Sequence, residues 1–220
     1  MVQNTSHAVM SQRTEPDDSL DDFPTPPWAT RALLELFVRS ADDTCLEPAC
    51  GRGHMAKVLL EYFKSVTASD VHNYGFGGVR NYLAPSNYEP HDWIITNPPF
   101  KRAEEFILRS LNIARVGIAI LARSVFTESV GRYENLFSWK PPTTVAQFVE
   151  RVPMVKGRLD PTATTATSYA WFIWHMETIG DTKLVWIPPC RKRLERPLDY
   201  LEQWFKPEGE SDDASCPSGP

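Results

Sequence analysis

The sequence predicts an α/β protein with a mostly parallel sheet and helices on both of its faces. The chain has 220 residues, 42% of them hydrophobic, which is enough for one well-buried core. From Phe23 to about residue 121, strand-like segments alternate with amphipathic helices, and strand-like segments alone follow. Alternation followed by strands indicates a parallel sheet that carries antiparallel strands at one edge.

The first half of the chain supplies the alternating elements. A helix is expected after Thr25, because prolines suit the first helical positions and Thr is a good cap. A second helix is expected over residues 55–63 and a third over 103–114, where apolar residues recur at helical spacing. Strands are expected at residues 44–47, 66–70, 93–96 and 117–121, with a weak one at 79–83.

The second half predicts strands at residues 145–149, 168–174 and 184–187, with no convincing helix between them. Residues 191–205 have apolar positions compatible with a terminal helix. Residues 123–167 are the least informative segment.

Charge divides the chain into a core and two tails. Residues 1–22 hold five acidic side chains and one basic one, and residues 206–220 hold four and one. The ends therefore carry −7 against a net charge of −5, which leaves about +2 for residues 23–205. Both ends are polar and read as disordered acidic tails around a single domain, 23–205. The acidic total does not exclude a nucleic-acid partner.

The composition argues against membrane, secreted and metal-binding proteins. No apolar run reaches the roughly 20 residues of a membrane span, and the amino terminus lacks a secretory signal. The four cysteines lie apart without metal-ligand spacing, and the five histidines are scattered. We therefore expect reduced thiols, a cytoplasmic location, no metal site, no membrane contact and no obligate protein partner.

A glycine turn follows the first strand, in Glu47-Pro48-Ala49-Cys50-Gly51-Arg52-Gly53. Glycines at the carboxyl end of a strand let the backbone approach a ligand closely. Asp70 ends the next strand, where an acid can accept both hydroxyls of a ribose. Glu47 can face the positive end of a bound methionine moiety. A purely structural turn and a strand-ending acid are the alternatives.

The run Asn97-Pro98-Pro99-Phe100 ends the strand at 93–96 and suits an exocyclic amine. The lone pair of such an amine is delocalised, so acceptors aimed at its hydrogens stabilise the charge that develops during methyl transfer. The Asn97 oxygen and the Pro98 carbonyl are the two acceptors, on a loop that two prolines stiffen. Phe100 can stack on a flipped base. The alternative is a strand that simply ends in a proline turn.

These motifs, together with Phe23-Pro24-Thr25-Pro26-Pro27, resemble the amino-methylating class I methyltransferases, most closely the DNA N6-adenine branch. The resemblance covers residues 22–190, and small stand-alone enzymes of this kind are typical of phages. It implies a Rossmann-like fold with a mostly parallel seven-stranded sheet, and S-adenosylmethionine as the methyl donor.

The resemblance also implies donor-binding roles. Thr25 and Pro26 match the segment at the methionine end of the donor. The loop beneath that end corresponds to Glu47, Pro48, Ala49, Gly51 and Gly53. Asp70 matches the ribose-binding acid, and Val71 the apolar neighbour of the adenine.

Asn81 and Tyr82 stand where the family commonly has Asp-Phe, whose acid contacts the amino group of the donor adenine. Asn81 keeps a carbonyl acceptor but lacks the charge, which leaves the donor affinity open.

Several cations and aromatic residues are candidates for nucleic-acid contact: Arg123, Phe126, Arg151, Lys156 and Arg158. For each one, a solvated loop residue is an equally good reading. No segment is long enough for a separate target-recognition domain, so we expect a short or relaxed target.

The residues predict methylation of an exocyclic amine, and the resemblance implies that the acceptor is adenine N6 in DNA. RNA bases and protein glutamine amides remain alternative acceptors, because Asn-Pro-Pro with an aromatic residue serves all of them. A catalytically silent nucleic-acid-binding module is a further alternative.

Overall fold

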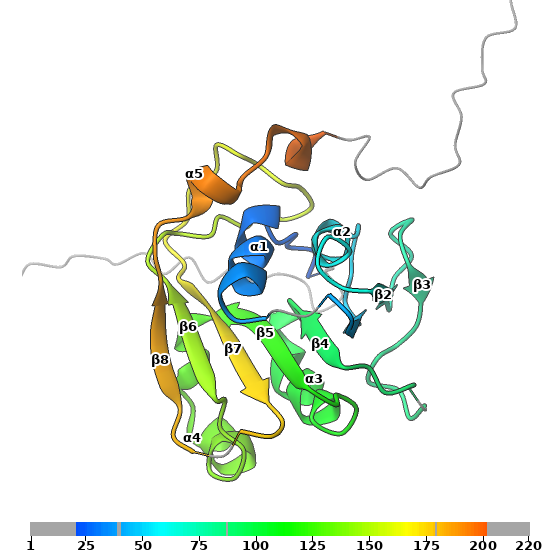
Figure 1. Ribbon diagram of the computed structural model, residues 1–220, viewed down its shortest axis with the longest axis vertical. Helices are drawn as coiled ribbons and strands as arrows, with labels where there is room; N and C mark the ends of the chain where they lie inside the picture. The colour runs from blue at the N-terminus through cyan, green and yellow to red at the C-terminus, as the bar shows by residue number, and fades with distance from the viewer. Residues whose placement is uncertain (1–20, 39–40, 87, 179, 202–220) are drawn as a thin grey trace, which may run out of the picture.

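The computed structural model describes residues 21–38, 41–86, 88–178 and 180–201, which form one sheet with helices around it (Figure 1). The strands lie in the order β3-β2-β1-β4-β5-β7-β6-β8. Their bounds are β1 (Thr44–Glu47), β2 (Ser65–Asp70), β3 (Gly78–Val79), β4 (Trp93–Thr96), β5 (Gly117–Arg123), β6 (Thr144–Phe148), β7 (Tyr169–His175) and β8 (Lys183–Ile187).

The helices are short and fill the connections between strands. They are α1 (Pro27–Leu36), α2 (His54–Leu59), α3 (Ala103–Ser110), α4 (Val130–Arg132) and α5 (Arg191–Leu194). Single 3₁₀ or π turns add η1 (Phe100–Arg102), η2 (Ser124–Thr127), η3 (Tyr133–Phe137) and η4 (Pro197–Tyr200). Among the helices of these described segments, none has the length and apolarity that crossing a bilayer requires.

The parallel half of the sheet positions a ligand crevice. β1 pairs with β2 on one side and with β4 on the other, both in parallel. After β1 the chain passes through α2 to β2 on one side of β1, and it later places β4 on the other side. Such a switch point opens a crevice beyond the carboxyl ends of the strands.

The other half confirms a mostly parallel sheet with its antiparallel pairing toward one edge. β7 runs antiparallel between β5 and β6. β8 pairs in parallel with β6 and makes eight strands, so the expected number of seven was wrong. The segment α4–η3 lies within 123–143, where no helix was expected, and it connects β5 to β6.

The core lies on both faces of the sheet, and β7 shows the alternation. Trp171 packs in the cluster that contains Trp28 of α1, whereas Phe172 packs in the cluster that contains Phe106 of α3 and Leu136 of η3. Successive side chains of a strand point to opposite faces, so one strand supports both layers. Figure 1 shows α1 and α2 on one side of the sheet and α3 on the other.

The terminal helix expected over 191–205 is wrong in extent. α5 ends at Leu194, Glu195 is extended, and Pro197 begins the 3₁₀ turn η4. Proline lacks the N–H that a continuing helix needs and disfavours helical backbone in the residue before it. Residues 202–205 lie outside the described segments.

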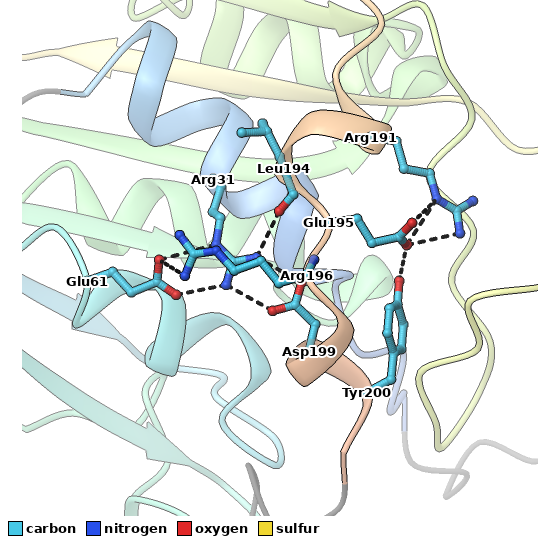
Figure 2. A network of polar contacts seen from close by, with 8 residues as sticks. All are labelled: Arg31, Glu61, Arg191, Leu194, Glu195, Arg196, Asp199 and Tyr200. Carbon is cyan, nitrogen blue, oxygen red and sulfur yellow. Dashed lines mark hydrogen bonds and ion pairs between the residues drawn. The ribbon is translucent and has the colours of Figure 1, made fainter.

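The carboxyl-terminal segment is held by the buried Arg31 of α1 (Figure 2). Its guanidinium donates to both carboxylate oxygens of Asp199 at 2.8 and 2.9 Å, and to the Leu194 carbonyl at 3.0 Å. It also donates to Glu61 at 2.8 Å, and Glu61 pairs with Arg196 at 2.9 Å. The network joins α1, the end of α2 and η4.

Two other expectations concern the tails and the thiols. Cys45, Cys50 and Cys190 are buried free thiols, and Cys216 lies outside the described segments. The disorder expected for both tails also falls outside them, except at Asp21 and Asp22, which contact the site described next. Within the described ranges, no cluster of His, Cys, Asp or Glu suits a metal ion.

Candidate functional site

A cavity of about 750 Å³ opens at the carboxyl ends of β1, β2 and β4. Five segments line it: Asp21–Thr25, the turn after β1, residues 70–74, the loop after β4, and Arg123 at the end of β5. The fold therefore brings together motifs that lie roughly 20 to 100 residues apart in the sequence.

The glycine turn is tied to the end of β2. Gly51 and Gly53 have left-handed backbone with φ of 50° and 84°, which side chains rarely adopt. A Cβ on Gly53 would also lie 2.6 Å from the Phe76 ring. The Gly51 N–H donates to Asp70 at 2.9 Å, and the His72 N–H donates to the other Asp70 oxygen at 3.0 Å. One Asp70 oxygen thus holds the glycine turn through Gly51, and the other accepts from the segment that follows β2.

Glu47 is a buried carboxyl group at the floor of the cavity. It is 2% exposed, and its Oε2 atom has no hydrogen-bond partner within the described segments. Burial, followed by the negative charge of Asp70, raises the pKa of Glu47 well above its usual range. A positively charged or hydrogen-bonding ligand would satisfy this oxygen.

His54 and Cys50 are neutral groups of the same wall. Burial, with the charges of Arg52 and Lys57, lowers the pKa of His54 to about 3. Burial raises the pKa of the Cys50 thiol far above its usual range. With so low a pKa the His54 imidazole is a weak base, and with so high a pKa the Cys50 thiol is not ionised at neutral pH, so neither is suited to act as a general base or a thiolate nucleophile.

Asn97 follows β4, and contacts from two distant segments fix its side chain. Its Nδ2 lies 3.1 Å from the Phe23 carbonyl and 3.1 Å from the Thr25 hydroxyl. The Met154 sulfur lies 3.6 Å from the same nitrogen. The Oδ1 atom is shielded from water and has no hydrogen-bond partner in the part of the chain that is described.

Phe100 lies in a cluster of aromatic side chains with one cation. Its ring centroid is 5.6 Å from that of Phe23 and 6.3 Å from that of Tyr169. The Arg123 guanidinium lies 4.4 Å from the Phe100 centroid and also contacts Tyr169. The Phe100 N–H donates to the Asp21 carboxylate at 2.7 Å. An aromatic platform with a cation over it is therefore present at the cavity.

The structure brings most of the expected site residues to the cavity. Those that line it are Thr25, Glu47, Ala49, Gly51, Asp70, Val71, Asn97, Pro99, Phe100 and Arg123. Pro26, Pro48, Gly53 and Pro98 adjoin these residues in the chain without lining the cavity themselves.

Asn81 and Tyr82 are not brought to the cavity. The Asn81 side chain accepts from the Leu83 N–H at 3.0 Å, which closes a local turn. Tyr82 is 1% exposed and packs with Phe106, and its hydroxyl lies 2.8 Å from that of Ser110. The Tyr82 side chain is therefore part of the core on the α3 face.

The expected nucleic-acid residues divide into three groups. Arg123 lines the cavity. Phe126 is 7% exposed, with its ring against Phe172, so it cannot stack on a base without unpacking the core. The three cations of the segment after β6 are exposed away from the cavity lining: Arg151, Lys156 and Arg158.

Several residues of the site were not predicted from the sequence, and four of them show why. Asp21 and Asp22 read as the end of an acidic tail, yet both line the cavity. Met154 lies in the least informative segment, and Tyr169 reads as core because it stands in an apolar strand. The contacts that bring Asp21, Met154 and Tyr169 to the site span more than 50 residues, so no local sequence pattern marks these residues as part of it.

Three solved structures share this architecture. A candidate class I S-adenosylmethionine-dependent methyltransferase from Listeria monocytogenes superposes with a TM-score of 0.54 at 11% identity, over 77% of this chain and 67% of that one. The modification subunit of a candidate type I restriction enzyme from Vibrio vulnificus superposes with a TM-score of 0.55 at 15% identity, over 84% of this chain and 51% of that one. A candidate RNA methyltransferase from Pyrococcus horikoshii superposes with a TM-score of 0.52 at 17% identity, over 74% of this chain and 91% of that one.

The fold is that of a class I methyltransferase. At these identities the likeness shows the fold alone, and this chain spans about half the length of the Vibrio subunit. No family model matches the chain, and no curated protein matches it. In the methyltransferase fold, the cavity occupies the switch-point crevice where ligands of open α/β sheets bind.

Proposed function

We propose that the protein transfers a methyl group from S-adenosylmethionine to the exocyclic N6 of adenine in DNA. The observation that carries the proposal is the Asn97 amide. Its nitrogen is held by Phe23 and Thr25, and its oxygen is left as an unpartnered acceptor in a residue that lines the cavity. An acceptor in such a position suits an N–H of the substrate.

The residues around the glycine turn fit the proposed donor. The unpartnered Glu47 oxygen suits the ammonium group of the methionine moiety. Each Asp70 oxygen accepts one backbone N–H and keeps acceptor capacity for a ribose hydroxyl. Val71 is 51% exposed beside Asp70 and offers an apolar contact for an adenine ring. When bound, the donor supplies an electrophilic methyl group on a positively charged sulfur.

The chemistry at Asn97 is electrostatic. The amine donates one hydrogen to Asn97 Oδ1, and the carbonyl of Pro98, which adjoins Asn97 without lining the cavity, is the acceptor proposed for the other. Two such acceptors favour a pyramidal nitrogen with an available lone pair. The new C–N bond takes that lone pair, the electrons of the broken S–C bond stay on sulfur, and the extra proton leaves N6 for water. No residue has to act as a base before transfer, and His54 in the cavity wall is a weak base because burial lowers its pKa to about 3.

Phe100 provides the stacking surface for the base. Arg123 lies over this ring, so it must move aside when a base enters and can then contact a phosphate. Four acidic side chains of the described segments line the cavity (Asp21, Asp22, Glu47 and Asp70), so a phosphate would depend on direct contact with one of the four cations that also line it: Arg52, Lys101, Arg102 and Arg123. A protein glutamine brings no phosphate to them. RNA remains the main alternative acceptor, because these contacts do not distinguish ribose from deoxyribose.

The test is to incubate the protein with methyl-labelled donor and unmethylated DNA, RNA or protein, and then to analyse the nucleosides. We expect label in DNA as N6-methyladenine. Label in RNA or protein alone would refute the proposed acceptor. Donor binding without transfer to any acceptor would favour the silent binding module.

The substitution Asn97→Ala tests whether the Asn97 side chain is needed for methyl transfer. We expect transfer to fall at least about 100-fold, the size of effect seen when one preorganised polar group is removed from a transition state. Donor binding, measured by calorimetry, should stay close to wild type. Asn112→Ala is the matched control, because Asn112 is an exposed asparagine that bonds the Leu108 carbonyl and does not line the cavity. Wild-type activity of Asn97→Ala would refute the mechanism.

A further inference from the structure

We propose that Thr25 is a positioning residue: with the Phe23 carbonyl it fixes the Asn97 amide so that Oδ1, and not Nδ2, faces the acceptor nitrogen. The inference rests on the proposed function and gives Thr25 a role other than holding the methionine end of the donor.

The chemistry of the Phe23 contact fixes the identity of the amide atoms. A backbone carbonyl can only accept a hydrogen bond, so the Asn97 atom 3.1 Å from it must be the nitrogen. The Thr25 hydroxyl lies 3.1 Å from the same nitrogen and accepts its second hydrogen. With both hydrogens engaged, the amide has one orientation, and its oxygen remains without a partner.

The orientation matters because the two ends of an amide have opposite polarity. A flipped Asn97 would present N–H donors to an amine that also carries N–H groups, and the stabilising acceptor would be lost. The Phe23 carbonyl alone occupies one hydrogen of the NH₂ group and leaves the side chain free to tilt about that bond. The contact with Thr25 restricts this freedom, and the Met154 sulfur, a weak acceptor 3.6 Å from the same nitrogen, adds to the restriction without replacing the hydroxyl.

The Thr25 side chain is itself firmly held. It is 3% exposed, and it precedes α1, whose first residues Pro27 and Trp28 are buried. The preceding residues are anchored by the Phe23–Phe100 ring contact and by the Gly157 N–H, which donates to the Asp22 carbonyl at 2.8 Å. The hydroxyl is therefore preorganised before any ligand binds.

The test compares Thr25→Val, which keeps the shape and removes the acceptor, with Thr25→Ser, which keeps the hydroxyl. For Thr25→Val we expect kcat to fall about 10- to 100-fold, the penalty of a small misplacement of a catalytic group. The KM for the donor and the Kd for S-adenosylhomocysteine should not change. Thr25→Ser should restore kcat toward wild type. Thr30→Val is the matched control, because Thr30 is a fully buried threonine of α1 that does not line the cavity.

A second readout is independent of turnover. The side-chain amide resonances of Asn97 are identified by ¹⁵N–¹H NMR through their loss in Asn97→Ala. In Thr25→Val, one Asn97 amide proton should shift upfield and exchange faster with water, whereas Thr25→Ser and Thr30→Val should leave it in place. If Thr25→Val does not fold, Thr25→Ala removes the same acceptor without added bulk.

The outcomes separate this inference from the proposed function. Wild-type kcat with a raised donor KM in Thr25→Val would make Thr25 a donor contact and overturn the inference, while methyl transfer itself would stand. Unchanged Asn97 resonances in Thr25→Val would overturn it as well. If the wild type transfers no methyl group to any acceptor, the proposed function fails, and the NMR experiment still decides whether Thr25 orients Asn97.

Discussion

At the scale of single residues, the cavity contains polar groups whose hydrogen bonding is incomplete. Glu47 Oε2 and Asn97 Oδ1 are shielded from water and have no partner in the described segments. They lie at the carboxyl ends of two adjacent strands, β1 and β4. Leaving a buried acceptor unsatisfied costs about 1–3 kcal/mol, so both groups weaken the unliganded fold. A ligand that donates to them recovers this free energy.

Glu47→Gln should stabilise the unliganded protein and weaken donor binding. The folded pKa of Glu47 lies above its ordinary value of 4.5, so stability falls as the pH rises from that value through the folded pKa. The variant removes this loss, and its melting temperature should exceed that of the wild type at pH 8 but not at pH 4. Losing a charge-assisted bond of about 1.5–3 kcal/mol should raise the donor Kd roughly 10- to 100-fold.

Thermal denaturation at several pH values and donor titration check the two parts. Glu104→Gln serves as the control, because Glu104 is a half-buried carboxyl of α3 outside the cavity. A donor Kd equal to that of the wild type would show that Glu47 does not contact the donor.

Single residues also mark the limit of sequence reading. Asn97, Asp70 and Gly51 were predicted from motifs, because their chemistry is local to a strand end. Phe126 and Tyr82 were assigned to ligands, yet the fold buries both in the core on the α3 face. An aromatic residue after a strand serves a stacking site or a core equally well, and only packing decides between them.

At the scale of elements, the segment α5–η4 is tied to α1 and to the end of α2 through Arg31 (Figure 2). Both Arg31 and Asp199 are 1% exposed. Removing one partner of a buried ion pair leaves the other charge uncompensated. The segment is therefore held by charge as well as by the apolar contact of Leu194.

Asp199→Ala should lower the free energy of unfolding by about 3 kcal/mol, the lower end of the range for breaking a buried pair, since Glu61 still pairs with Arg31. Urea denaturation measures it. Glu105→Ala removes the carboxylate of an exposed pair with Arg102, whose side chains are 54% and 53% exposed, and should change stability little. Equal effects of the two substitutions would show that the Arg31 network is not a significant source of stability.

At the scale of the whole molecule, the cavity lies beyond the carboxyl ends of the parallel strands β1, β2 and β4, and Arg123 at the end of β5 also lines it. The exposed cations of the loop after β6 belong to the same region, because Gly157 bonds the Asp22 carbonyl at the cavity. If the substrate is a nucleic acid, as proposed above, we expect this loop to contact the part of it that lies outside the cavity.

A combined Arg151→Gln, Lys156→Gln and Arg158→Gln variant should weaken DNA binding and flatten its salt dependence. For each cation that pairs with a DNA phosphate, its removal should make the slope of log K against log salt shallower by about 0.9. Fluorescence anisotropy between low and moderate salt measures the slope, and donor affinity should not change. A slope and affinity equal to those of the wild type would place the DNA interface elsewhere.

The sequence by itself determined the parallel half of the sheet, the strand at 184–187, the glycine turn and the Asn-Pro-Pro-Phe loop. Each depends on a period or on residues that are adjacent in the chain. The tertiary structure alone decided that Asp21 reaches Phe100, that Thr25 and Met154 hold Asn97, and that Asp199 joins the η4 turn to Arg31. These contacts span 57 to 168 residues, and no local pattern encodes which distant side chains a folded core brings together.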